Sequence, residues 1–177
     1  HVLCALALVH ANAHKRFPDF DAVLRDYLAK VDATYLGGYQ GGLLCMLIES
    51  YGDPTFYPKL RQATRYLLEA QGKEGTWTYN TSIPTEMFKD AHEGQVLRIS
   101  GGTPVEGPGS AGEQWTRLTD WAKGGDGDNS VSQFALLGLY SASRSGIRLP
   151  AATWTRNLET FRKRQNKEGG WAYHERS

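Results

Sequence analysis

The chain has 177 residues, of which 40% are apolar and 22% charged, which is enough for one domain with a buried core. Lysine and arginine total 20, and aspartate and glutamate total 19, so the net charge of +1 excludes recruitment of nucleic acid or an anionic membrane by bulk charge. The apolar runs are shorter than the roughly 18 residues of a membrane helix, and we therefore expect a soluble chain without a transmembrane segment.

Residues 3–13 and 21–31 predict a first helical hairpin, with an apolar inner helix and an amphipathic outer helix. His10 and His14 lie four residues apart on one helical face, the spacing of two metal ligands, but no H-E-x-x-H pattern accompanies them. We expect surface or interhelix histidines and no metal site. Cys4 and Cys45 each lie in an apolar run, where free cysteines usually pack as small hydrophobes.

Residues 34–51 carry small or apolar side chains on nearly every face, which predicts an inner helix surrounded by others. Residues 57–71 place apolar side chains at helical spacing with lysine and arginine between them, which predicts an outer helix with one solvent-exposed face. The segment QGKEGTWTY follows from Gln71. Its glutamine can bond free helix carbonyls, its glycine permits a reversal, and Trp77 can cover the helix end.

Residues 80–127 are rich in glycine, proline, serine, threonine and charge. A loop of this length is uncommon in a compact domain and is often functional, so we interpret it as an insertion. Residues 87–92 and 114–121 predict short helices inside it, and residues 101–112 predict irregular structure.

A second copy of the hairpin follows the insertion. Residues 129–144 predict an inner helix, and residues 151–165 predict an outer helix with Trp154, Leu158 and Phe161 at helical spacing. The segment QNKEGGWAY then begins at Gln165. An offset of 94 residues (165 − 71) superposes both hairpins and both aromatic turns, and an offset of 39 residues superposes the first hairpin on the second. Repeated aromatics usually serve what all repeats share, so Trp77, Tyr79, Trp171 and Tyr173 are expected to be packing residues.

The pattern Q-x-x-x-G-x-W resembles the QW motif of the terpenoid cyclase and protein prenyltransferase superfamily, which includes squalene-hopene cyclase. The resemblance implies an all-α fold, the α/α toroid, with an inner and an outer layer of helices. Residues 1–177 would then form a single domain, an incomplete arc of about three hairpins that flanking repeats or self-association would complete. Both ends look cut, so the compartment stays open. The motif residues are Gln71, Gly75, Trp77, Gln165, Gly169 and Trp171.

The same resemblance singles out two carboxylates before the second inner helix. Asp126 and Asp128 match the first and third positions of the D-x-D-D motif with which class II cyclases protonate an alkene or epoxide. Asn129 departs at the fourth position. The alternative is that Asp128 caps the helix, where the helix dipole favours an ionised carboxylate.

Two other chemistries of this superfamily lack their essential thiol. Asp128 stands where a zinc-dependent prenyltransferase has a cysteine ligand, and Ala111 stands where a thioester protein has its cysteine. We therefore expect no cofactor. Tyr35, Tyr39 and Phe134 on the inner helices are candidate ligand contacts through their π faces.

Two functional hypotheses follow. The favoured one is a squalene-cyclase-like or prenyltransferase-like toroid repeat domain that is non-catalytic and binds a partner or an apolar ligand, such as an isoprenoid or a protein, on its inner face. The alternative is a fragment of a class II terpenoid cyclase that uses Asp128 as general acid and Asp126 as its supporting carboxylate.

Overall fold

A computed structural model describes residues 2–33, 36–79, 81, 83, 99–100, 103–104 and 127–172. These residues are mostly helical, which confirms the all-α prediction. No helix among them is long and apolar enough to cross a membrane. The elements are α1 (Val2–His10), α2 (Ala13–Arg16), α3 (Pro18–Lys30), α4 (Gly37–Tyr51), the 3-10 helix η1 (Pro54–Phe56), α5 (Tyr57–Ala70), β1 (Ile99–Ser100), β2 (Thr103–Pro104), α6 (Asn129–Arg144) and α7 (Ala151–Arg164).

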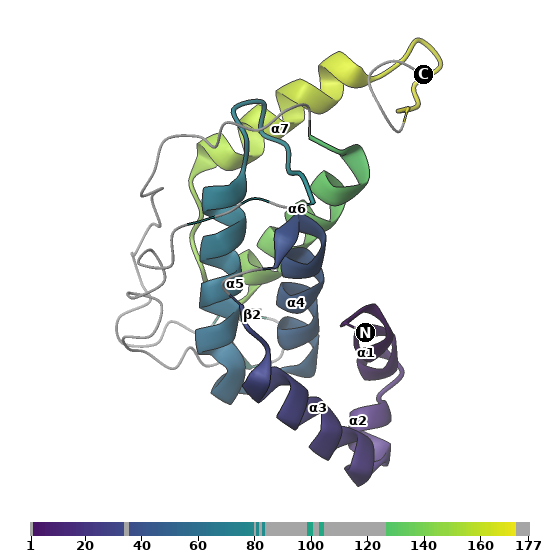
Figure 1. Cartoon of the computed structure of the whole chain (residues 1–177), viewed down its shortest axis with the longest axis vertical. Coiled ribbons are helices and arrows are strands. Elements are labelled where there is room, and N and C mark those ends of the chain that lie inside the picture. Colours follow the sequence, from purple (N-terminus) through teal and green to yellow (C-terminus); the bar gives the residue numbers. More distant parts are fainter. Residues whose placement is uncertain are drawn as a thin grey trace.

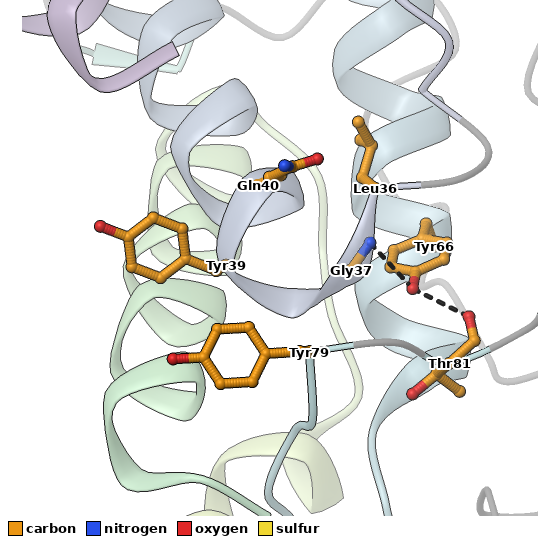
Figure 2. A pocket seen from close by; sticks show the side chains of 7 residues that line it. All are labelled: Leu36, Gly37, Tyr39, Gln40, Tyr66, Tyr79 and Thr81. Carbon is orange, nitrogen blue, oxygen red and sulfur yellow. Dashed lines mark hydrogen bonds between the residues drawn. The ribbon is translucent and has the colours of Figure 1, made fainter. Parts of the chain in front are cut away.

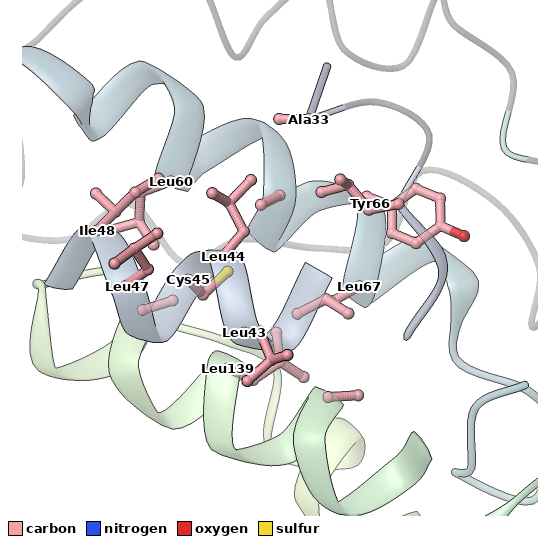
Figure 3. Close-up of a cluster of buried hydrophobic side chains, with 14 of the residues drawn as sticks. Ala33, Leu43, Leu44, Cys45, Leu47, Ile48, Leu60, Tyr66, Leu67 and Leu139 are labelled. Carbon is pink, nitrogen blue, oxygen red and sulfur yellow. The ribbon is translucent and has the colours of Figure 1, made fainter. Parts of the chain in front are cut away.

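Helix α4 lies at the centre of the described core and contacts α1, α5 and α6 (Figure 1). Because it has neighbours on several sides, it needs apolar residues on several faces. Its leucines, Cys45 and Ile48 are fully buried against side chains of α5 and α6 (Figure 3). Burial raises the pKa of the Cys45 thiol to about 12, so this cysteine packs as an apolar residue. The same expectation is wrong for Cys4, which is exposed.

The repeat seen in the sequence is also present in the helix boundaries. Helices α5 and α7 begin at Tyr57 and Ala151 and end at Ala70 and Arg164, so both boundaries keep the offset of 94 residues. Gly52 and Gly146, at the same offset, both adopt positive φ angles, of 76° and 92°. The two outer helices therefore share their length of 14 residues, and both hairpins have a glycine with positive φ after the inner helix.

The first hairpin departs from its prediction. The inner helix predicted over residues 3–13 ends at His10, because Asn12 adopts a left-handed conformation with φ 58°, and the chain resumes as the short helix α2. Asparagine tolerates this conformation better than most residues. Helix α3 begins at Pro18 rather than at residue 21, since proline is favoured in the first turn of a helix.

Helices α4 and α6 approach each other closely at two glycines. A Cβ atom on Gly138 would lie 2.4 Å from the Cα atom of Gly42, and a Cβ atom on Gly42 would lie 2.0 Å from the carbonyl oxygen of Phe134. The two backbones are thus in direct contact. Any side chain at Gly42 or Gly138 would force the helices apart.

Helix α7 buries a face that its pattern does not predict. Its apolar stripe contains Leu158, which is half exposed, whereas Thr153, Asn157 and Thr160 are buried. The reason is its neighbour: the polar stripe faces the aromatic turn that follows α5, and this turn offers backbone carbonyls as hydrogen-bond acceptors.

The inserted segment is described only at residues 81 and 83 and in β1 and β2, which pair antiparallel. The β1–β2 hairpin was not predicted. The short helices predicted at residues 87–92 and 114–121 lie outside the described residues, as do Tyr35, Asp126 and Tyr173.

Candidate functional site

The two aromatic turns are built in the same way. In the first turn, Nε2 of Gln71 donates to the Gly75 carbonyl oxygen at 3.0 Å, and Nε1 of Trp77 donates to the Leu67 carbonyl oxygen at 2.7 Å. In the second turn, Gln165 donates to Gly169 and Trp171 donates to Phe161, both at 2.7 Å. Gly75 and Gly169 have φ angles of 77° and 86°, which favour glycine. The glutamine and tryptophan therefore satisfy carbonyls of the turn and of the last helical turn.

The first turn is covered by α7, and the cover is polar. Gln71 also donates to the Thr153 carbonyl oxygen at 2.9 Å. Asn157 donates from Nδ2 to the Gly75 carbonyl oxygen at 2.9 Å, and the Thr160 hydroxyl donates to the Glu74 carbonyl oxygen. The first turn thus joins two successive outer helices.

Asp128 caps helix α6. Its Oδ1 accepts a hydrogen bond from the Val131 backbone amide at 2.8 Å, and its own amide donates to the Trp77 carbonyl oxygen at 3.0 Å. Acceptance of an amide hydrogen bond three residues ahead is what the side chain of an aspartate N-cap does. This geometry is that of the capping alternative, and the partner carboxylate Asp126 lies outside the described residues.

Asn129, at the fourth position of the D-x-D-D comparison, forms two side-chain hydrogen bonds. Nδ2 of Asn129 donates to the Ala172 carbonyl oxygen at 2.7 Å, and its Oδ1 accepts from Arg164 at 2.9 Å. Asn129 therefore ties the start of α6 to the second aromatic turn. An aspartate at this position would lack the amide donor.

A pocket of about 590 Å³ opens beside the N-terminal end of α4 (Figure 2). This volume falls within the range of small-molecule sites, roughly 300 to 1,000 Å³. The lining residues come from the start of α4, from the middle of α5 and from the segment after the first aromatic turn. They are Leu36, Gly37, Tyr39, Gln40, Tyr66, Tyr79 and Thr81.

One tyrosine fixes the wall of this pocket. The hydroxyl of Tyr66 accepts a hydrogen bond from the Gly37 amide at 3.0 Å and donates to the Thr81 carbonyl oxygen at 2.9 Å. Gly37 has φ 67°, and a Cβ atom there would lie 2.0 Å from the Tyr79 carbonyl oxygen. The three segments are therefore held together at the pocket before any ligand binds.

Two further tyrosines of the pocket, Tyr39 and Tyr79, differ in their packing. The ring of Tyr39 packs on Phe134 of α6 at a centroid distance of 4.4 Å, whereas Tyr79 is 53% exposed. Of the aromatics predicted to contact a ligand, Tyr39 lines the pocket and Phe134 supports it from behind. Tyr79, which was expected to be a packing residue, also lines the pocket (Figure 2).

The described lining of the pocket offers aromatic, amide and hydroxyl groups. It contains no carboxylate, imidazole, thiol or amine, so the hydroxyls of its tyrosines and of Thr81 are its groups that could act as acid, base or nucleophile. Its rings offer π faces to an apolar ligand, and the Gln40 amide is its most versatile polar group. Groups of three or more potential metal ligands do not occur within the described segments.

The two histidines of the first hairpin contact α4. Nε2 of His10 lies 3.3 Å from the Ser50 hydroxyl, and the His14 ring meets Tyr51 edge-on at 5.4 Å. Burial, and then the charge of Lys15, lower the pKa of His14, while Asp21 acts in the opposite direction. Nδ1 of His14 is buried without a hydrogen-bond partner among the described residues, so protonation there would create a buried N–H without an acceptor.

We predict that the free energy of unfolding falls as the pH drops below about 6.5, the ordinary histidine pKa. A lowered pKa in the folded state means that the unfolded chain binds the proton more readily, and stability must then decrease on acidification. Urea denaturation at pH 7.5 and 5.5 measures the loss. His14→Gln should reduce the difference between the two pH values, and His10→Gln should retain it because His14 is unchanged. An equal loss in the wild type and His14→Gln would assign the effect to other groups.

Comparison with known protein families, with curated proteins and with solved structures returns no match to this chain.

Proposed function

We propose that this chain is a non-catalytic repeat domain of the α/α-toroid type that binds an apolar ligand in the pocket lined by Tyr39, Tyr66 and Tyr79. The observation that carries the proposal is the pocket itself. Its volume is typical of small-molecule sites, and tyrosine rings line it. The hydrogen bonds of Tyr66 hold the lining segments in place.

The chemistry of the lining favours a flat or extended hydrocarbon with one polar end, such as an isoprenoid alcohol. The Tyr39 ring packs on Phe134, and Tyr79, the last residue of the first aromatic turn, lines the same pocket (Figure 2). Rings of this kind contact hydrocarbon at low conformational cost. Gln40, an exposed side chain, offers both a donor and an acceptor to a hydroxyl group.

Two features support a non-catalytic domain over the cyclase alternative. Oδ1 of Asp128 accepts the Val131 amide as a helix cap does, and Asp128 is not among the pocket-lining residues. A general acid has to reach the proton acceptor within hydrogen-bond distance.

Replacement of Tyr79 with alanine should weaken binding about fivefold to tenfold, because one ring contact of roughly 1 kcal/mol is lost. The measurement is displacement of the dye 8-anilinonaphthalene-1-sulfonate by farnesol. Tyr140→Ala is the matched control, because Tyr140 is equally exposed, at 57%, and does not line the pocket. Equal effects of both substitutions, or no displacement by farnesol, contradict the proposed site.

The purified wild-type chain also tests the alternative hypothesis of a class II cyclase. Incubation with squalene and farnesol, followed by mass spectrometry of the extract, should yield no cyclised product. Cyclised product from the wild type that disappears in Asp128→Asn would replace our proposal with the cyclase, because asparagine keeps an oxygen for the Val131 amide while it removes the acid.

A further inference from the structure

Several positions of the α6–α7 hairpin are exposed, although their equivalents in the α4–α5 hairpin are buried. Across the offset of 94 residues, Leu43 is 2% exposed and Leu137 38%, and Trp77 is 1% exposed and Trp171 49%. On the outer helices, Leu158 is 51% exposed, whereas its equivalent Thr64 is buried against Cys45 of α4 in its own hairpin. The difference that a neighbouring hairpin accounts for therefore affects the inner helix and the turn.

The α4–α5 hairpin shows what covers these positions. Helix α6 packs along α4, and α7 lies against the first aromatic turn (Figure 1). The polar stripe of α7 supplies the contacts: the Thr153 carbonyl oxygen accepts from Gln71, and Asn157 and Thr160 donate to carbonyl oxygens of the turn. A neighbouring hairpin therefore buries both an apolar face and a set of backbone acceptors.

The second turn repeats this set of groups. Gln165 and Trp171 make the same internal hydrogen bonds as their equivalents, and the carbonyls of Glu168 and Gly169 correspond to those that α7 binds in the first turn. Residues 165–171 are all exposed. Within the described part of the chain, no helix lies against them as α7 lies against the first turn.

We propose that the surface formed by α6, α7 and residues 165–171, here called the open edge, is the docking site for a further helical hairpin of the same repeat. Its outer helix carries the donor pattern of α7, an amide side chain followed three residues later by a hydroxyl. Its inner helix covers Leu137 of α6. An apolar face of this kind normally has a partner, and repeat proteins bury such faces by stacking.

The hydrogen bonds argue against a second copy of this chain as the occupant. In a second copy of the chain, the outer helix left available for docking is α3, which belongs to the first hairpin. The repeat offsets place Leu24 on α3 where α7 has Asn157, and Leu24 is buried and has no donor. Helix α7 of a second copy is already bound to its own first turn.

The test extends the full chain by a glycine-serine linker of about 20 residues, which spans roughly 25 Å, and by a second copy of residues 150–165. The linker gives the added helix a local concentration in the millimolar range, which compensates for its short length. The matched control carries Asn157→Ala and Thr160→Ala in the added copy only. The readout is the indole ¹H–¹⁵N resonance of Trp171, assigned with Trp171→Phe.

We expect the Trp171 indole resonance to shift and its hydrogen exchange to slow at least about fivefold in the extended chain, because docking covers the turn. In the control the protection should fall about tenfold or vanish, since two hydrogen bonds of roughly 0.5 to 1.5 kcal/mol each are lost. No protection in the extended chain, or equal protection in the control, overturns the proposal. Sedimentation velocity of the unextended chain provides the other outcome: self-association that Trp171→Ala removes would assign the open edge to a second copy instead.

Discussion

Replacement of Trp77 with alanine should lower the free energy of unfolding by about 3 to 5 kcal/mol, as expected for a large aromatic removed from a core. The Trp77 ring is buried, its indole satisfies the Leu67 carbonyl at the end of α5, and its backbone amide and carbonyl bond Ser132 and Asp128 at the start of α6. The substitution therefore leaves a cavity and an unsatisfied carbonyl where α5 and α6 meet. Urea denaturation followed by far-ultraviolet circular dichroism measures the loss.

The equivalent substitution in the second turn is the control. Trp171→Ala removes the same type of indole hydrogen bond, to Phe161, but from a half-exposed ring, so the loss should be about 1 kcal/mol or less. Losses of similar size at Trp77 and Trp171 would contradict the difference in burial between the two turns.

Gly138→Ala should destabilise the chain by about 2 to 4 kcal/mol and lower its melting temperature by roughly 5 to 15 °C. The added methyl group would lie 2.4 Å from the Cα atom of Gly42. A backbone atom cannot rotate away as a side chain can, so α4 and α6 would have to separate. Thermal unfolding monitored by circular dichroism gives the shift.

Two glycines with different neighbours serve as controls for Gly138→Ala. The atoms nearest to a Cβ on Gly41 are side-chain atoms of Leu67, at 3.0 Å and beyond, and of Tyr66, at 3.7 Å, and a Cβ on Gly170 meets Asn166 side-chain atoms at 3.5 Å or beyond. Gly41→Ala should stay within about 1 kcal/mol of the wild type, because the gain in helix propensity offsets part of the strain. Gly170→Ala should be nearly neutral. Destabilisation by Gly41→Ala as large as by Gly138→Ala would contradict the backbone contact.

The helical repeat could be predicted because its signals are local. Hydrophobic spacing and the residues of a turn are read within about ten positions of one another, and the boundaries of α5 and α7 agree with their predictions to within a residue. The break after His10 was missed because a single asparagine, Asn12, causes it, and asparagine adopts positive φ only in some contexts.

The pocket and the closest helix contact could not be predicted because they depend on pairing between distant segments. Gly42 and Gly138 come together only once α4 and α6 lie side by side. Tyr66 and Tyr79 reach the pocket from α5 and from beyond the turn, and their types alone fit a core equally well. The one available signal was Gly37, a glycine at the start of an apolar helix, which marks a close approach of backbones.

The polar stripe of α7 shows the limit of amphipathic patterns. Leu158 and its apolar neighbours predict the buried face, yet Asn157 and Thr160 are the side chains that the chain itself buries. Apolar spacing predicts which face of a helix is favoured for burial. It does not say which neighbour covers that face.

Hydrogen exchange of the two turn indoles tests most directly the central claim that one turn structure is used twice, once buried and once at an open edge. Both indoles donate to a backbone carbonyl at 2.7 Å, so geometry alone predicts equal protection. Our account predicts that the Trp77 indole exchanges only through global unfolding, whereas the Trp171 indole exchanges through local opening and at least about a hundredfold faster. Equal protection of Trp77 and Trp171 would contradict it.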